Sequence, residues 1–375
     1  MRFLTRSFGI TDGEVLSDVA DEPLSKGVVR MWQWRRLVFG RSSAGFVVRL
    51  LLLLAILSAV PIARARAAQA ATAWTIFLPF LANGGSPPVS QVMPPTNWSY
   101  YITTTDPNVA YSLGCNQGTF DASQSPPTNS LVVLDFGGQL GDGSGTLMIN
   151  GLDASNAQIE AVAEAFGHGY WYCTGHDLTS KLSLALGTNN SYFDVSWSGG
   201  TTWAQNVQAV VAYNQANGYN SQVITDGGND IEPDWDTTVD SEAWVNGFAA
   251  TSSTFSVDYG SADGCPTDSS ANAPCSNGWT QYDVWYVSWG ATSAQALPEI
   301  YSSTDAQQWA MLSLYGAEYR GSTGKISFMG PVDTYPSWNT SNTPLQAWQQ
   351  LWGDLNSTAA TAENMPFSAE MHNET

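Results

Sequence analysis

Apolar runs alternate with amphipathic segments along the chain from residue 131 onward. The run LVVLDFG (131–137) has no regular polar alternation, which is typical of a strand buried on both faces of a parallel sheet. Segment 203–218 instead repeats apolar residues at helical spacing and ends at a glycine. The pattern predicts strands over 131–137, 170–175, 181–187, 222–228, 254–260, 282–290, 298–302 and 325–330, and helices over 153–166, 203–218, 241–252, 305–319 and 344–355.

This alternation indicates parallel strands that are joined by right-handed crossovers. About eight strands in one domain favour an α/β fold of the irregular (β/α)8-type barrel class over a doubly wound sheet. The predicted strands 170–175 and 181–187 leave little room for a helix between them, so we expect a barrel with some helices missing. No G-x-G-x-x-G motif follows a strand, which argues against a dinucleotide-binding fold.

The N-terminal region has the pattern of an export signal. An Arg-rich stretch precedes the apolar run 50–60, and small residues follow it. The run is shorter than the roughly 20 residues that a membrane-spanning helix needs, which favours a cleaved signal over a permanent anchor. We therefore expect a secreted or cell-surface protein that meets the membrane only through its signal sequence. The expected organisation is an upstream extension (1–30), a signal peptide (31–70), a Pro/Gly/Ser-rich linker (71–97), a barrel (98–366) and a tail (367–375).

Charge is distributed unevenly along the 375 residues, whose formal net charge is -20. Beyond residue 70 the chain carries 3 basic and 28 acidic groups, a formal charge of -25. Such a surface repels phosphate backbones, and the three basic residues Lys181, Arg320 and Lys325 are too few for a basic stripe. The charge pattern therefore excludes nucleic acid as a partner.

All four cysteines lie beyond the predicted signal peptide. An even number of cysteines in an exported chain indicates disulfides rather than free thiols. Three pairings of four cysteines exist, and we favour Cys265 with Cys275 and Cys115 with Cys173. The three histidines of the chain give little support to a zinc site.

The segment ITDGGNDIEPDWD (224–236) contains five carboxylates and no Lys or Arg. These are Asp226, Asp230, Glu232, Asp234 and Asp236. Like charges at close range raise one another's pKa and oppose folding. A bound cation, a catalytic task or exposure to water could each offset this repulsion, and the sequence leaves the three open. We expect no cofactor, with calcium as the alternative, because alternating acidic side chains offer the oxygen ligands that calcium prefers.

In a barrel, the active site lies at the carboxyl ends of the strands. Asp135 ends the first predicted strand, and residues 226–236 are expected in the loop after the fourth. We therefore expect the strand ends to form one acidic, aromatic mouth. The candidate substrate-binding residues there are Trp289, Trp235, Tyr259, Tyr301 and Asn229.

The motifs LDFGGQ and NDIEP resemble those of the glycoside hydrolase family 25 lysozymes, and of glycoside-hydrolase-like barrel domains of unassigned activity. The resemblance implies that Asp135 matches the first-strand aspartate, Asp230 the assisting aspartate and Glu232 the general acid. Asp226 would then tune the site electrostatically. In a purely structural interpretation, Asp226 closes its strand by accepting backbone N–H groups.

Together these observations predict an exported carbohydrate-active barrel, with glycosidase activity on a cell-wall or polymeric glycan as the leading hypothesis. The alternative is a non-catalytic surface or glycan-binding protein on the same scaffold, with or without a calcium site. The two hypotheses share the scaffold and the glycan partner and differ in turnover.

Overall fold

The computed structural model describes residues 92–374, apart from 192–194, 269–272 and 335–341. All described residues belong to one compact unit, Phe80–Thr375. The predicted extension, signal peptide and most of the linker lie outside the described residues. Within the described part, no helix is both long and apolar enough to cross a membrane.

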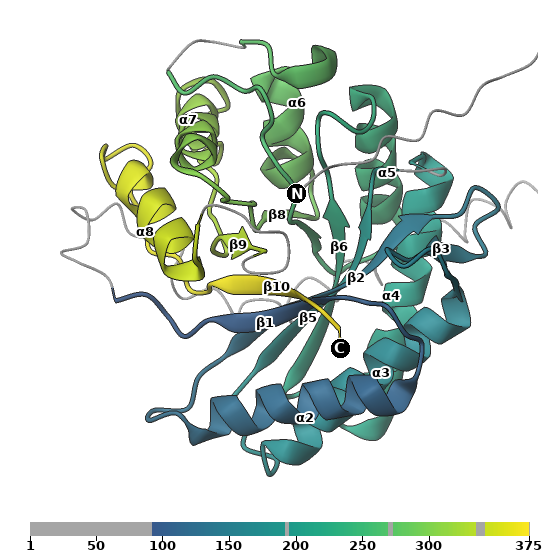
Figure 1. Cartoon of the computed structure of the whole chain (residues 1–375). Coiled ribbons are helices and arrows are strands. Elements are labelled where there is room, and N and C mark those ends of the chain that lie inside the picture. Colours follow the sequence, from purple (N-terminus) through teal and green to yellow (C-terminus); the bar gives the residue numbers. More distant parts are fainter. Residues whose placement is uncertain (1–91, 192–194, 269–272, 335–341, 375) are drawn as a thin grey trace, which may run out of the picture. The chain divides into compact units, whose positions relative to one another are not determined.

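The scaffold of the described residues is a curled sheet of parallel strands (Figure 1). In chain order these are β1 (Asn97–Tyr101), β2 (Ser130–Gln139), β5 (Leu182–Asn189), β6 (Val223–Asp230), β7 (Ser256–Asp258), β8 (Ala294–Ala296), β9 (Val332–Asp333) and β10 (Ala369–Asn373). Their order in the sheet is β8-β7-β6-β5-β2-β1-β10-β9, and each pair of neighbours is parallel. A small antiparallel hairpin, β3 (Gly145–Leu147) and β4 (Asp153–Ser155), extends β2.

The two edges of this sheet also contact each other. Isolated parallel bridges join Ala296 to Phe328 and Glu299 to Val332, which connects the β8 segment to the β9 segment. Two backbone hydrogen bonds accompany them, from Met329 N to Ala296 O (2.9 Å) and from Val332 N to Pro298 O (2.8 Å). The prediction of an α/β fold with parallel strands is therefore confirmed, and the strands form a curled sheet.

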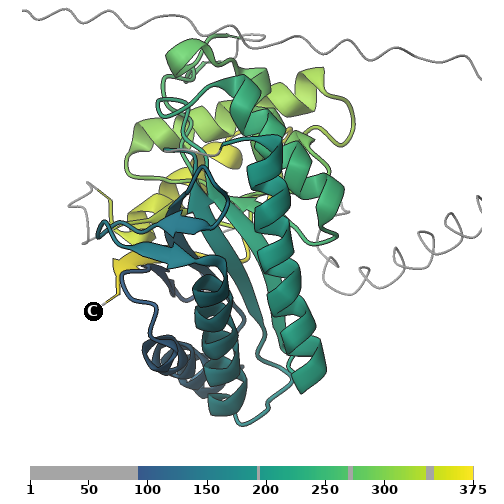
Figure 2. The ribbon, with the colours of Figure 1, turned by 90° about the vertical axis from the view of Figure 1, so that its right-hand side faces the viewer.

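Helices surround the strands on the outside of the sheet (Figures 1 and 2). They are α2 (Pro107–Ser123), α3 (Asn156–Cys173), α4 (Trp197–Asn217), α5 (Thr238–Thr251), α6 (Gln281–Trp285), α7 (Ser303–Tyr319) and α8 (Pro344–Leu355). Local sequence sets their ends: Ser196 caps α4 through its hydroxyl, and Gly218 stops it in the left-handed region at φ 78°.

Each connection between successive parallel strands contains a helix. The prediction that a helix is missing, which was based on strands at 170–175 and 181–187, is therefore wrong. Residues 170–173 form the last turn of α3 and not a strand. The predicted strand 282–290 is also wrong, because it folds into α6 and one turn of π-helix, Tyr286–Gly290. Aromatic and β-branched residues favour strands, but here tertiary packing overrides that preference.

Six strands were not predicted: β1, β3, β4, β8, β9 and β10. The predicted strands 298–302 and 325–330 are wrong, because they contain only the isolated bridges at Glu299 and Phe328. β1 has the sequence NWSYY, and β10 lies in the segment that was expected to be a tail. β10 pairs with β1 on one side and with β9 on the other. The C-terminal segment is therefore an interior strand of the sheet.

The sheet separates two apolar clusters. Alternate residues of β2 point to opposite faces, so Leu131 and Val133 pack inside the curl while Val132 and Leu134 pack against the helices. The inner cluster is small and includes the ring of Tyr259. Most of the buried apolar surface lies in the outer cluster, between the sheet and the helices.

Tyr259 occupies space that two glycines leave free. A Cβ atom at Gly187 would lie 2.4 Å from the Tyr259 hydroxyl, and one at Gly228 would lie 3.1 Å from the ring. The hydroxyl donates a hydrogen bond of 2.7 Å to the carbonyl of Thr188. The ring therefore fills the inside of the curl close to the carboxyl ends of the strands.

Two disulfides have the predicted pairing. Cys115 and Cys173 connect α2 to α3 across 58 residues of sequence, and Cys265 and Cys275 close a loop between β7 and α6. No cysteine in the described part is free. The first disulfide fixes two helices that also pack closely through Gly114 and Gly169, where a Cβ atom would collide with backbone of the facing helix.

We predict that deleting residues 367–375 prevents cooperative folding, because β9 loses its neighbouring strand and β1 keeps only its pairing with β2. The measurement is thermal unfolding followed by circular dichroism. Met371→Leu is the control: it keeps the strand and the buried volume, and should cost less than about 1.5 kcal/mol. A truncated chain that unfolds with the wild-type transition would contradict the structural role of β10.

Candidate functional site

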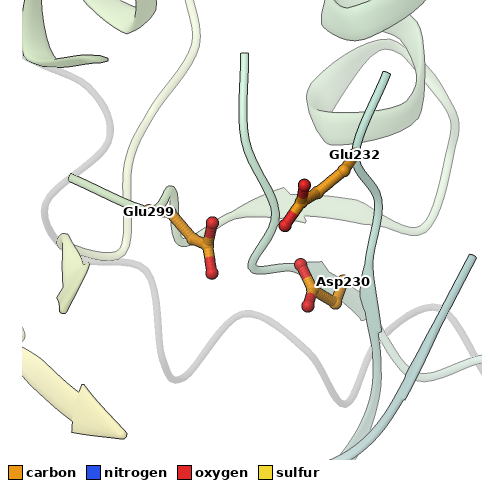
Figure 3. A group of neighbouring side chains, drawn as sticks. All are labelled: Asp230, Glu232 and Glu299. Carbon is orange, nitrogen blue, oxygen red and sulfur yellow. The ribbon is translucent and has the colours of Figure 1, made fainter. Parts of the chain in front are cut away.

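Three carboxylates from two regions of the sequence meet at the carboxyl ends of the strands. Asp230 is the last residue of β6, Glu232 follows two residues later, and Glu299 follows β8. One oxygen from each side chain lies within 4.8 Å of the others (Figure 3). We call Asp230, Glu232 and Glu299 the carboxylate trio.

Asn190, directly after β5, fixes the backbone of Glu232. Its side-chain oxygen accepts from Glu232 N (3.0 Å), and its amide nitrogen donates to Glu232 O (3.1 Å). The same nitrogen donates to the hydroxyl of Ser241 on α5 (3.2 Å). Asn190 is fully buried, so these bonds are shielded from water and hold the segment after β6 against β5.

Glu299 is held through both its backbone and its side chain. Its N–H donates to Gly260 O (3.0 Å), and an isolated parallel bridge pairs its backbone with that of Val332 at the other edge of the sheet. The hydroxyl of Tyr301 donates to Glu299 Oε1. Tyr301 is itself fixed, because its N–H donates to the Asp305 carboxylate (2.9 Å) in the capping box of α7.

Two members of the trio are buried, Glu232 is half-buried, and none has a basic partner among the described residues. Asp230 is 4% exposed and Glu299 6%, and Asp230 Oδ1 has no hydrogen-bond partner among the described residues. The described basic residues are engaged elsewhere: Lys181 with Ser221, Lys325 with Glu363, His372 with Glu370, and Arg320 over Tyr282 and Trp285. Water exposure, one of the three explanations for the acidic run, therefore fails for Asp230.

Burial raises the pKa of all three carboxyls. The pKa of Glu232 rises to about 8, first through desolvation and then through the negative charges of Asp263 and Asp234. The pKa of Asp230 and that of Glu299 also rise well above their ordinary values, again mainly through desolvation and then through the neighbouring carboxylates. Without a cation, the trio therefore retains protons at neutral pH.

The other two predicted acids lie outside the trio. Asp135 Oδ1 accepts from Gly137 N (2.7 Å) where β2 bulges, and burial raises its pKa to about 6. Asp226 accepts from Phe255 N (3.1 Å) and from the hydroxyl of Ser183 (3.2 Å). It precedes Asp230 by four residues on the same strand face, about 13 Å deeper. Its bonds match the interpretation in which Asp226 closes a strand by accepting a backbone N–H group.

Asp226 to Asp230 also do not form the loop that was predicted after the fourth strand. β6 continues through Asp230, so the acidic run is divided between a strand end and the following turn. The strand geometry explains why Asn229, one residue before Asp230, points to the opposite face. Asn229 is buried, and its Oδ1 has no partner in the described residues.

A cavity of about 220 Å³ adjoins the trio. It is lined by Glu232, Ser261, Ala262, Asp263, Glu299, Tyr301, Asp305 and Gln308. Of the predicted substrate-binding residues, only Tyr301 is in this lining. Trp235 is 41% exposed, and the indole of Trp289 donates to Thr323 O (3.0 Å). The predicted aromatic mouth is therefore not what lines this cavity. Its wall consists mainly of carboxylate, hydroxyl and amide groups, with Tyr301 as the one aromatic residue.

Sequence reasoning missed Glu299 and Asn190. Glu299 lies near the start of the predicted strand 298–302, so the rule that active-site residues follow barrel strands pointed to Tyr301 and not to Glu299. In the structure Glu299 instead follows β8 (Ala294–Ala296), a strand that was not predicted. Glu299 has no acidic neighbours in sequence, whereas the segment 224–236 contains five carboxylates and dominates the acidic pattern. Asn190 has no comparable signal, since its role depends on a backbone contact 42 residues away.

Comparisons with known proteins assign no family to this chain. No protein-family model matches it, and no curated protein matches it. Solved structures that align with it include proteins from Labrenzia alexandrii DFL-11 and Roseovarius sp. TM1035, which carry the names mandelate racemase/muconate lactonizing enzyme and mandelate racemase/muconate lactonizing enzyme-like protein. Their identities are 15% and 11%, with TM-scores of 0.36 and 0.34. The alignments cover 74% of this chain in each case, and 53% and 54% of those chains.

This chain thus spans about half the length of the solved proteins that it matches. At these identities and TM-scores the matches assign neither an activity nor a ligand to it. The expected resemblance to family 25 lysozymes is corrected, since no protein-family model matches the chain and the reported solved structures carry other names. Glycosidase activity rested on that resemblance and is withdrawn with it. A physical reason is that Asp135, the expected first-strand acid, is engaged by Gly137, while the unpredicted Glu299 completes the cluster.

We predict that the chelated, cation-free protein loses stability as the pH rises from about 4.5 to about 8. Glu232 keeps its proton in the folded state over this range and has lost it in the unfolded state, so the unfolded state gains relative stability. Thermal melts in EDTA at several pH values measure this loss.

Glu232→Gln should show a smaller loss, because it cannot ionise. Glu318→Gln, at an exposed position on α7, is the control and should follow the wild type. If Glu232→Gln and the wild type lose stability in parallel, the Glu232 carboxyl is not the group that titrates.

Proposed function

We propose that this protein binds a hard divalent cation, of the Mg²⁺ and Ca²⁺ class, at the carboxylate trio. The site would lie at the mouth of an irregular (β/α)8-type barrel. The observation that carries the proposal is Asp230, a buried side chain that faces two further carboxylates and whose Oδ1 has no hydrogen-bond partner among the described residues. Burying such an oxygen without compensation costs free energy, and a cation removes that cost.

The donor set supports this class of ion. All three groups offer carboxylate oxygens, which suit hard cations, and no sulfur or imidazole ligand is in the set. The formal charge of the ionised trio exceeds that of one divalent ion. An ion of this charge would therefore hold the three side chains ionised at neutral pH.

The adjoining cavity supports a role for the ion beyond stability. Glu232 and Glu299 belong both to the trio and to the cavity wall, so a ligand in the cavity would lie next to the ion. When bound, such an ion polarises a ligand oxygen or acidifies a bound water. The hydroxyl of Ser261 and the amide of Gln308 also line the cavity and would orient the ligand.

Calorimetric titration of the chelated protein with MgCl₂ and with CaCl₂ tests the proposal. We expect one ion per chain, and a rise in melting temperature at saturation, since an ion held at 100 times its dissociation constant adds about 2.7 kcal/mol. Asp230→Asn and Glu299→Gln should each weaken binding about tenfold or more.

Asp226→Asn is the matched control, because it changes a fully buried carboxylate on the same strand but outside the trio. It should bind the ion as the wild type does. If neither salt gives binding heat or a shift in melting temperature, the carboxyls are neutralised by protons alone and the proposal is wrong.

We also propose that the mature chain is exported. The two disulfides support this, because such bonds persist in oxidising compartments. N-terminal sequencing of the protein recovered from outside the producing cell should find a start close to Ala68 or Ala71. Recovery of the intact leader with the cells would contradict cleavage.

A further inference from the structure

The bond between Tyr301 and Glu299 limits how Glu299 can meet a cation. The phenol donates to Oε1, so one of the two carboxylate oxygens is already engaged. Glu299 is almost completely buried, and its backbone is fixed by Gly260 and by pairing with Val332. The carboxylate therefore has little freedom to turn both oxygens toward the trio.

Tyr301 has little freedom of its own. Its N–H donates to Asp305, and the neighbouring Ser302 N–H donates to the same oxygen (2.8 Å). These bonds form the start of α7, which packs against α8. The phenol is therefore presented to Glu299 by a rigid helix terminus and not by a loose loop.

The two hard cations differ in what they need from a carboxylate. Ca²⁺ takes six to eight oxygens at roughly 2.3–2.6 Å and often binds both oxygens of one carboxylate. Mg²⁺ takes six ligands at about 2.0–2.1 Å, keeps several waters and needs only single oxygens from a few side chains. A glutamate with one free oxygen favours Mg²⁺.

We propose that Tyr301 determines the ion preference of the trio: it holds Glu299 to one-oxygen ligation and thereby makes the site prefer Mg²⁺ over Ca²⁺. This inference rests on the proposed cation site. That site is supported by Asp230, a buried side chain that faces the same cluster and whose Oδ1 has no hydrogen-bond partner in the part of the chain that the structure describes. Tyr301 acts as a positioning residue through Glu299.

The test is the ratio of the Ca²⁺ and Mg²⁺ dissociation constants, measured by calorimetry on the chelated full chain. The wild type should bind Mg²⁺ more tightly. Tyr301→Phe removes only the hydroxyl, so Glu299 gains its second oxygen, and the ratio should shift toward Ca²⁺ by about tenfold, which corresponds to 1.4 kcal/mol.

Tyr170→Phe is the matched control. The Tyr170 hydroxyl donates to the buried carboxylate of Asp121 (2.8 Å), the same kind of bond, between α3 and α2 and outside the trio. The control should leave the ratio unchanged even where it lowers stability. A loss of packing alone would weaken both ions equally and so would not move the ratio.

Each outcome decides the matter. A shift toward Ca²⁺ in Tyr301→Phe alone supports the inference. An unchanged ratio, an equal loss of both affinities, or a wild type that prefers Ca²⁺ overturns it while the cation site stands. A wild type that binds neither ion removes the cation site as well, so the two failures are distinguishable.

Discussion

The parallel strands of the sheet all end at the same edge, so side chains that follow different strands share that edge. This constraint brings Glu299 to Asp230 and Glu232 although 69 and 67 residues, respectively, separate them in sequence. The three carboxylates stay close together as long as the strands that carry them run parallel. The sheet that assembles the site therefore also causes the electrostatic repulsion between the three carboxylates. The stability of the fold and the chemistry of the site depend on the same three side chains.

Much of the fold was predictable because long elements carry strong patterns. β2 and β6 were found from continuous apolar runs, and α4, α7 and α8 from helical spacing and caps. Short strands carry almost no pattern: β9 has two residues, and β7 and β8 have three each. Such strands are defined by their neighbours, which no local window of sequence contains.

The candidate site was predictable only in part, for a related reason. Asp230, Glu232 and Tyr301 were selected because a strand end marked them. Glu299 and Asn190 depend on pairing between distant segments, and the sequence has no local feature that marks such contacts. The dense acidic run also misled, because Asp226 serves the backbone of Phe255 and Trp235 remains exposed.

The ring of Tyr259 between Gly187 and Gly228 has a consequence for how this sequence can diverge. A side chain at Gly187 collides with the Tyr259 hydroxyl and one at Gly228 crowds the ring, while loss of the ring alone leaves a void. Each single replacement is therefore disfavoured, although a small residue at 259 could tolerate larger ones at 187 and 228. The three positions are expected to covary across related chains, and an alignment would reveal the inside of this sheet through that covariation without any coordinates.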